Sequence, residues 1–545
     1  MTSPSPGVSR REFLTYAAAG GLSAAAIVGT GWALRGILSP SGTDRLGPVG
    51  GPWELAPGVV DYNRVYAHGY GPTGLGFAND IQTAPQSQRI LNVAQWYDYW
   101  PGSVLRDFST YMTQRWEVNG VQVNWTSNVY VSNEELVAFV VDPDRGIDIS
   151  FPTNHFVELF EKMGLIVNLN RAWLPGYENI FGPIPDPIPP SRPDLTYHPD
   201  YPVYANGTNN HAAADFRSPA ANRYAYRHMY PAPRGADKIT WTEANGLLAV
   251  PYQWGTTGIG YRTDVFRKED IEALGWEVFE LSEYTNPAWE NPSGGITGPR
   301  TFDLTKKKMM LDDMREVFTA ALKARGWKEQ VAQGVDPPTG VVHNPASPYD
   351  GEFQWSANSV DDAQLRAATD WIHSFRASLW DFNTAQQGPW LVSGEVYLDQ
   401  AWSGDIMYAV RPNLVNHPPV DYFVPKQGSS RWVDAAVVHR TSTKLWLAHE
   451  FLNYLQDPLL QATISSWNLY PTPNAWTFEI LHEDPSYSSS DPSVGFYWNP
   501  AEDSRIYGDL AFGYGGPPIL NRCEDLRDLG PSGHSRYQRY WTDLR

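Results

Sequence analysis

The chain has 545 residues, of which 42% are hydrophobic and 19% are charged. This length exceeds the roughly 250–300 residues at which a single core stops growing, so we expect more than one core in a globular rather than a disordered protein. The net charge of −19 argues against nucleic-acid binding through a broad basic surface, and the single cysteine, Cys523, excludes a disulfide framework, a four-cysteine zinc site and an iron–sulfur cluster.

The N-terminus has the form of an export signal. Residues 9–14, SRREFL, resemble the twin-arginine signal, and a small-residue apolar stretch follows to about Leu34. We expect export by the twin-arginine route to the periplasm or the extracytoplasmic face. No convincing cleavage site follows, and the apolar stretch of about 20 residues is long enough to cross a bilayer. Residues 1–38 are therefore either a cleaved signal or an uncleaved membrane tether.

Two segments of unusual composition interrupt the chain. Residues 39–89 are rich in glycine and proline and are predicted to form a tether or an irregular surface segment. Residues 183–238 are rich in proline, tyrosine and histidine and are interpreted as a functional, disordered or decorating insertion. The histidines there lack a compact metal-ligand spacing, so we expect neither a metal site nor a cofactor.

Strands and helices alternate through the rest of the chain. Strands are predicted at Leu91–Gln95, Val121–Trp125, Gly146–Phe151, Gly246–Pro251, Val396–Trp402, Val420–Pro425 and Ala435–Val438. Helices are predicted at Trp100–Phe108, after the capping-box residues 132–135, at Thr153–Met163 and at Leu445–Leu455. This alternation predicts an α/β fold with helices on both sheet faces, and such folds bind ligands at the carboxyl ends of strands.

The first predicted strand ends in an unusual aromatic cluster. In residues 92–102, NVAQWYDYWPG, four aromatic rings and one carboxylate occupy five consecutive positions. Such a segment is either an aromatic loop that covers the edge of a core or a site for a ligand that is both cationic and apolar.

Nine motifs between about Ile90 and Arg545 resemble, in the same order, those of the spermidine/putrescine-binding proteins of bacterial ABC importers. The motifs are AQWYDYWPG, YVSNEEL, DISFPTNHFVELFEKMGLI, LLAVPYQWGTTGIGYRTDVF, LDDMREVFTAAL, GEVYLDQAWSGD, DYFVPKQGSSRWVDAAVV, AHEFLNYLQDP and LYPTPN. The resemblance implies a two-lobed, type II-like periplasmic binding protein fold, with a central cleft and strands that cross between the lobes. Lobe one would comprise residues 90–258 and 434–477, and lobe two residues 259–433 and 478–545.

The same resemblance implies that the chain captures a polyamine and delivers it to the permease and ATPase subunits of an ABC importer, as a monomer and without catalysis. A polyamine is a methylene chain with ammonium groups at intervals. Aromatic walls attract such a ligand with about 0.5–2 kcal/mol per contact, and carboxylates must meet its buried charges. An aromatic residue beside an acid recurs three times at predicted strand ends, and two further acids share one helix face. The ligand-binding residues implied by the motifs are Trp96, Asp98, Tyr99, Asp313, Glu316, Trp402, Asp405, Trp432, Asp434 and Tyr470.

Other functions stay open at this point. A binding protein for another cationic or polyhydroxylated solute would have a similar aromatic cleft, and so would an exported glycan-acting enzyme. A receptor that kept the fold and lost transport also agrees with the sequence. We expect no enzyme, because the chain lacks a GxSxG elbow, an HExxH motif, a dinucleotide-binding glycine motif and a cysteine cluster.

Overall fold

The computed structural model describes residues 54–56, 58–65, 75–97, 99–142, 144–170, 173–176, 248–291, 294–295, 297–334, 341–342, 352–353, 355–410, 419–474, 477 and 523–545. The expected export signal and the insertion 183–238 lie outside these residues. The chain divides into unit 1 (Met1–Gln253, Val433–Trp467 and Thr472–Ile480) and unit 2 (Trp254–Trp432, Asn468–Pro471 and Leu481–Arg545). Two strands, β7 (Val250–Arg262) and β16 (Ser429–Val438), each begin in one unit and end in the other.

Unit 1 is built on a mixed sheet. Its strands follow the order β16, β6, β3 and β4, and β5 pairs with the end of β3. Strand β3 is parallel to β4, β5 and β6, whereas β6 and β16 are antiparallel. The elements of this unit are β3 (Ile90–Trp96), α5 (Gly102–Trp116), β4 (Gln122–Asn124), β5 (Val129–Tyr130), α6 (Asn133–Val141), β6 (Ile149–Ser150), α7 (Asn154–Lys162), α16 (Leu445–Leu455) and α17 (Pro458–Asn468).

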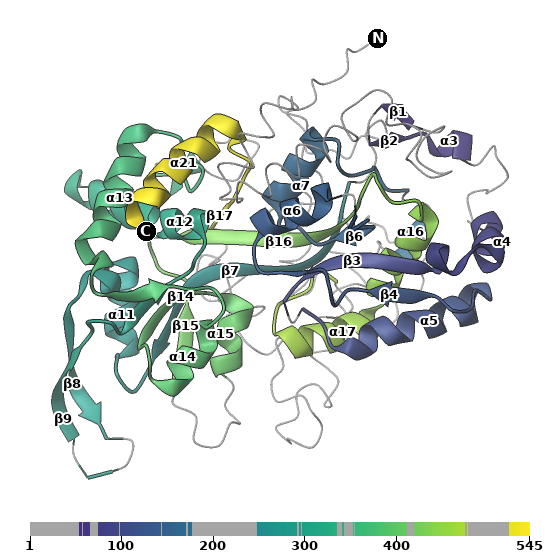
Figure 1. Ribbon diagram of the computed structural model, residues 1–545. Helices are drawn as coiled ribbons and strands as arrows, with labels where there is room; N and C mark the ends of the chain where they lie inside the picture. The colour runs from purple at the N-terminus through teal and green to yellow at the C-terminus, as the bar shows by residue number, and fades with distance from the viewer. Residues whose placement is uncertain are drawn as a thin grey trace, which may run out of the picture. The chain divides into compact units, whose positions relative to one another are not determined.

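Helices cover both faces of the unit 1 sheet (Figure 1). Helices α6 and α7 pack on one face in a cluster that includes Ala94 of β3 and Phe156 of α7. Helix α5 lies on the other side, where Phe108 contacts Phe451 of α16 with 5.0 Å between ring centroids. Apolar residues at helical spacing thus bury one stripe of each helix against the sheet.

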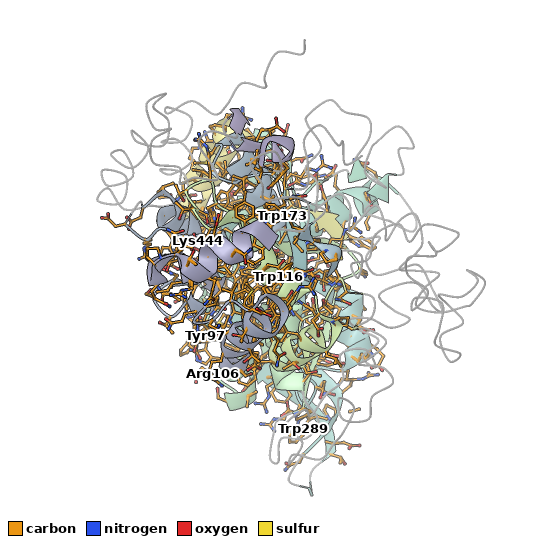
Figure 2. The ribbon with its side chains drawn as sticks, turned by 90° about the vertical axis from the view of Figure 1, so that its right-hand side faces the viewer. Tyr97, Arg106, Trp116, Trp173, Trp289 and Lys444 are labelled. Carbon is orange, nitrogen blue, oxygen red and sulfur yellow. The ribbon has the colours of Figure 1, made fainter. Side chains whose placement is uncertain are left out.

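The Gly/Pro-rich extension contains regular elements. They are β1 (Glu54–Ala56), β2 (Val59–Val60), α3 (Tyr62–Val65), α4 (Leu75–Thr83) and η3 (Gln86–Arg89). Phe77 of α4 contacts Trp173, labelled in Figure 2, and lies parallel to Trp446 of α16. The prediction of an irregular segment is therefore wrong for residues 75–83, where these aromatic contacts stabilise a short helix. The helix was not predicted because the glycines and prolines that flank it are typical of irregular segments.

Unit 2 is also a mixed sheet, with the order β13, β10, β14 and β7. Strand β10 is parallel to β13 and β14, β7 is antiparallel to β14 and β15, and β17 runs parallel to the start of β16. Its elements are α11 (Lys268–Leu274), η7 (Gly275–Glu280), β8 (Glu283–Glu290), β9 (Thr297–Asp303), β10 (Lys308–Met310), α12 (Met314–Ala332), β11 (Val341–Val342), β12 (Glu352–Phe353), α13 (Asp362–Arg376), β13 (Leu379–Phe382), α14 (Gln387–Ser393), β14 (Leu398–Trp402), α15 (Ser403–Val410), β15 (Val420–Phe423), β17 (Cys523–Asp525) and α21 (Gly530–Leu544).

The core of unit 2 depends on the C-terminal helix. Helices α12, α13 and α21 lie on one side of the sheet, and α14 and α15 lie on the other (Figure 1). Tyr537 and Trp541 of α21 belong to the same buried cluster as Ile259 of β7 and Phe318 of α12. The hairpin of β8 and β9, which the sequence did not suggest, projects from this unit (Figure 1).

Several predicted elements have different lengths in the structure. Helix α16 has the predicted bounds, but α5 continues past Phe108 because Met112 extends its buried stripe. Strand β7 runs on from the predicted apolar segment through TTGIG, and β16 begins six residues before Ala435. Glycine is depleted in strands and serine has little strand preference, so the prediction stopped short at these residues. Among the described helices, none has the length and apolar character needed to cross a bilayer.

Candidate functional site

Asp434 is a buried carboxylate of unit 1 that receives two hydroxyl hydrogen bonds. The Tyr99 hydroxyl donates to Oδ2 at 2.5 Å, and the Thr153 hydroxyl donates to Oδ1 at 2.7 Å. A backbone bridge between Thr153 and Asp434 brings the second donor into range. Burial raises the pKa of Asp434 to about 7, although both hydroxyls lower it. A cation placed beside this carboxylate would favour its ionised form.

Aromatic rings pack around Tyr99, the phenol that hydrogen-bonds Asp434. The centroid of Tyr252 lies 5.1 Å from that of Tyr99 and 4.8 Å from that of Phe151. Burial raises the pKa of Tyr130 and of Tyr252, and the negative charge of Asp434 raises both further. The rings therefore lie within the electrostatic reach of the carboxylate, and unit 1 combines an acid with aromatic faces.

Trp96 ends β3 beside this group. Its Nε1 donates to the carbonyl of Phe151 at 2.9 Å, and its half-buried ring lies 4.8 Å from that of Tyr130. The neighbouring Tyr97 is 75% exposed (Figure 2). Asp98, the acid predicted to accept an ammonium group here, lies outside the described residues.

Asp313 and Glu316 begin helix α12 in unit 2. Asp313 is the N-cap, and its Oδ1 accepts the backbone N–H groups of Arg315 and Glu316 at 2.9 and 3.0 Å. Glu316 is buried and accepts the Ser430 hydroxyl at 2.5 Å. Burial and then Asp313 raise the pKa of Glu316 to about 7, whereas Ser430, Thr257 and Arg315 lower it. Burial also raises the pKa of Asp313.

Asp405 lies in the first turn of α15, where a phenol and an amide contact it. The Tyr470 hydroxyl donates to Oδ2 at 2.6 Å, and Nε2 of Gln387 donates to the same oxygen at 3.3 Å. Oε1 of Gln387 accepts the backbone N–H of Trp402 at 2.8 Å. Gln387 thereby fixes Asp405 relative to the end of β14, and the carboxylate itself stays exposed.

Two glycines allow the aromatic rings of unit 2 to pack closely. A Cβ on Gly404 would lie 2.5 Å from the Tyr470 ring, and a Cβ on Gly255 would lie 2.6 Å from the Trp432 ring. Trp432 and Tyr470 contact each other with 5.2 Å between centroids. The glycine of the WSGD sequence is therefore required for Tyr470 to reach Asp405.

The structure changes one predicted pairing. Trp432 and Asp434 lie inside β16, so the prediction that this pair marks a strand end is wrong. Trp432 packs on Tyr470 in unit 2, whereas Asp434 binds Tyr99 in unit 1. The strand was placed too late because its first residues are serines and an arginine.

Sequence reasoning missed several polar partners in these groups. Thr153, Ser430 and Gln387 hydrogen-bond the predicted acids; Thr153 and Ser430 lie inside two of the nine motifs but were not picked out, and Gln387 lies outside all of them. Asp399 was also missed: it is fully buried in β14, and neither carboxylate oxygen has a hydrogen-bond partner among the residues that the structure describes. Burial, together with the charge of Asp405, raises the pKa of Asp399 well above its ordinary value. The sequence signal that could have identified Asp399 is its position as an acidic residue inside the predicted strand Val396–Trp402.

The described part of the chain offers no metal site. No group of three or more His, Cys, Asp or Glu side chains gathers there in a way that suits a metal ion. The arrangement instead presents separate carboxylates with hydroxyl donors and aromatic rings.

Known proteins resemble the chain over most of its length. The spermidine/putrescine-binding periplasmic protein of Salmonella typhimurium is 20% identical over 83% of this chain and 90% of that protein. The putrescine-binding periplasmic protein SpuD of Pseudomonas aeruginosa is 22% identical over 84% and 92%. A solved structure of a spermidine/putrescine ABC transporter protein from Listeria monocytogenes matches 84% of this chain and 98% of that chain, with 18% identity and a TM-score of 0.52. No family model matches the chain.

The comparisons bear on two predictions. The structural match confirms the mixed α/β fold of the periplasmic binding protein type. The relatives are solute-binding proteins, which confirms the expectation that the chain is not an enzyme.

Proposed function

We propose, from the premise that the chain is a solute-binding protein of the polyamine-binding family of ABC transporters, that its solute is a short polyamine such as putrescine or spermidine. The premise is a distant homology that extends over 83% of the chain, and it confirms the family suggested by the nine motifs. The identity of the amine rests on the site residues of this chain.

The observation that carries the proposal is a pair of buried carboxylates, one in each unit. Asp434 and Glu316 are 4% and 3% exposed, and the side chains that hydrogen-bond them are neutral hydroxyls. A buried carboxylate without a counterion is costly, and an ammonium group would supply the missing charge. Two such acids favour a ligand with at least two positive centres, and the adjacent tyrosine and tryptophan rings suit the methylenes between them.

We propose the following contacts. Asp434, Asp98, Asp313, Glu316 and Asp405 accept ammonium groups, and the rings of Trp96, Tyr99, Trp402, Trp432 and Tyr470 contact the methylene chain. A micromolar affinity corresponds to about 8 kcal/mol, which a few charge-paired ammonium groups and aromatic contacts supply after the costs of association.

Calorimetry with matched ligands tests the proposal. Purified protein, unfolded and refolded to remove any amine carried through purification, is titrated with putrescine and spermidine. 1,4-Butanediol, which has the putrescine carbon chain without charge, is the control. We expect heat and a raised melting temperature with the amines and neither with the diol. If the protein instead binds a sugar or a quaternary amine with a single charge, the polyamine proposal is wrong and that solute is the ligand. The assignment as a solute-binding protein would still hold.

The location and the partners follow the same family. As a binding protein of an ABC importer, the chain acts outside the cytoplasm, and we propose that as a monomer it delivers its solute to the permease and ATPase subunits. We also propose export by the twin-arginine route, with residues up to about Leu34 as a tether if they are not removed. Replacing Arg10 and Arg11 with lysine should leave folded protein in the cytoplasm, and unchanged export would rule this route out.

A further inference from the structure

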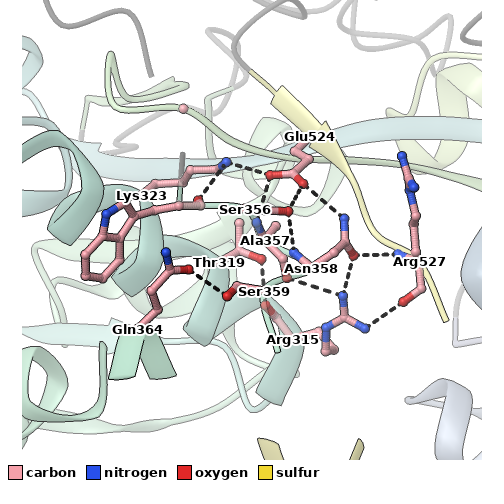
Figure 3. Close-up of polar contacts among 12 residues, drawn as sticks. Arg315, Thr319, Lys323, Ser356, Ala357, Asn358, Ser359, Gln364, Glu524 and Arg527 are labelled. Atoms are coloured by element: carbon pink, nitrogen blue, oxygen red, sulfur yellow. Dashed lines mark hydrogen bonds and ion pairs between the residues drawn. The ribbon is translucent and has the colours of Figure 1, made fainter. Parts of the chain in front are cut away.

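One polar network of unit 2 fixes a loop (Figure 3). Glu524 of β17 accepts hydrogen bonds from Lys323 Nζ at 2.6 Å, from the backbone N–H of Ala357 at 2.7 Å and from the Ser356 hydroxyl. These bonds hold the loop at residues 355–360 against α12, and we call them the loop network. None of its four residues is a proposed solute contact, so its contribution is to the stability of unit 2.

A second network of unit 2 centres on the side-chain amide of Gln387, in the first turn of α14. Gln387 is only 3% exposed. Its Nε2 donates to the carbonyl of Thr384 at 2.8 Å and to Oδ2 of Asp405 at 3.3 Å, and its Oε1 accepts the backbone N–H of Trp402 at 2.8 Å. The reverse orientation would turn the amide oxygen towards two acceptors and the NH2 group towards a donor. The contacts therefore decide which end of the amide faces Asp405.

The end of β14 needs this amide because its neighbouring strand is short. The N–H of Leu398 in β14 donates to the carbonyl of Lys307, on the side of β10, at 3.2 Å. N–H groups on one edge of a strand recur at every second residue, so the N–H of Trp402 faces the same side. Strand β10 ends at Met310, and its pairing with β14 stops short of Trp402. The oxygen of Gln387 supplies the missing acceptor.

Helix α14 also lies close to the backbone of Asp405. A Cβ on Gly388 would lie 2.9 Å from the carbonyl oxygen of Asp405, which is closer than Cβ atoms in proteins come to such an atom. The oxygen Oδ2 that accepts Gln387 also accepts the Tyr470 hydroxyl at 2.6 Å. The exposed side chain of Asp405 is thus held on one oxygen by an amide and a phenol that come from different segments of the chain.

We propose that Gln387 is a positioning residue for the solute, acting through Asp405: its amide ties the Asp405 carboxylate to the end of β14 beside Trp402, so that both are in place before the solute arrives. The inference rests on the proposed function, in which Asp405 accepts an ammonium group and the ring of Trp402 contacts the adjacent methylenes. Ordering an exposed side chain during binding costs free energy, and a carboxylate that is already held avoids much of that cost.

The test is a double-mutant cycle in which calorimetry measures spermidine affinity. Q387M removes the amide and keeps the length of the side chain, D405A removes the carboxylate, and a third protein carries both changes. Q386M is the matched control, because the side chain of the adjacent Gln386 makes no capping hydrogen bond to α14. S356A is a second control, since it removes a hydrogen bond of the loop network.

We expect Q387M to bind spermidine about five- to tenfold more weakly than the wild-type protein, because the carboxylate is no longer held. In the D405A background the same change should cost less than about twofold, since its target is already gone. Q386M and S356A should both bind within about twofold of the wild-type protein. Normal binding by Q387M, an equal loss in both backgrounds or an equal loss in S356A would overturn the inference.

Two further measurements keep the test decisive. If Q387M does not fold, G388A replaces it: the added Cβ pushes α14 away from the Asp405 carbonyl and leaves the Gln387 side chain unchanged. G388A should also weaken spermidine binding in the wild-type background and not in D405A, and normal affinity in G388A would contradict the inference.

If the wild-type protein binds no amine, the proposed function fails, and urea unfolding then tests the link between Gln387 and Asp405 by itself. Q387M and D405A each break the same hydrogen bond, so together they should lower the urea midpoint by less than the sum of their separate effects. Additive shifts of the midpoint would reject the link between the two residues.

Discussion

Replacing Asp434 with asparagine should strengthen the fold and weaken amine binding at the same time. The asparagine keeps the shape of the side chain and can still hydrogen-bond Tyr99 and Thr153, but it cannot ionise. In the free protein, burial raises the pKa of Asp434 from 3.8 to about 7. The fold therefore favours the protonated acid, whereas the unfolded chain ionises it freely above pH 4.

The size of the stability effect follows from that shift. A rise of about 3 pKa units at about 1.4 kcal/mol each corresponds to a loss of about 4 kcal/mol in the free energy of unfolding, complete above pH 7. The contribution of Asp434 is fully present below about pH 4 and disappears as pH rises to 7. The asparagine variant does not lose this stability, so the difference in the free energy of unfolding between the variant and the wild-type protein should grow from pH 4 to 7 and then level off.

Two assays on one preparation check this prediction. Urea unfolding at pH 4.5, 6, 7 and 8.5 gives the stability difference, and calorimetry with spermidine at pH 7.5 gives the affinity. Removing a charge partner of a bound ammonium should cost about 2–5 kcal/mol of binding free energy, and Trp432→Ala should cost less because it removes only a ring contact. A variant that is less stable than wild type at pH 8.5, or that binds spermidine normally, would refute the reasoning.

Three other expectations concern the remaining acids and one glycine. Spermidine affinity should fall below about pH 7, because Asp434 and Glu316 must each release a proton before they can accept an ammonium group. Calorimetry at pH 6 in buffers of different ionisation enthalpy should detect that proton release. Binding heats that do not depend on the buffer would contradict this expectation. Gly404→Ala should displace the Tyr470 ring and weaken spermidine binding by about three- to tenfold, equivalent to about 1 kcal/mol. An unchanged spermidine affinity in this variant would contradict the expectation. Asp399→Asn should raise the free energy of unfolding at pH 7–8 but not at pH 4, because the buried acid must stay protonated in the fold; a destabilised variant in urea at pH 8 would speak against this.

The sequence predicted helices and strands well where the interactions that form them join residues close together in the chain. Residues 132–135 have capping-box form, and in the structure the Ser132 hydroxyl accepts the N–H of Glu135 while the Glu135 carboxylate accepts the N–H of Val131. Helix α6 begins there for reasons contained in five consecutive residues, 131–135. The aromatic end of β3 and the helix Leu445–Leu455 were predictable in the same way.

Contacts between distant parts of the chain were not predictable by spacing. The Tyr99 hydroxyl bonds Asp434 across 335 residues, and Tyr470 bonds Asp405 across 65. Motif resemblance named these residues as members of a site but gave no partner for any of them. The start of β16 was missed for a related reason: Ser429 and Ser430 are fully buried beside β17, which comes from much later in the chain.

The dependence of unit 2 on helix α21 has a consequence for biosynthesis. Tyr537 and Trp541 share a core with Ile259, which is made about 280 residues earlier, so at roughly 5–20 residues per second this core waits on the order of 15–60 s for its last side chains. During that time the ribosome-bound chain exposes an incomplete apolar surface. Early chaperone engagement on the nascent chain is the expected consequence for a protein folded in this way.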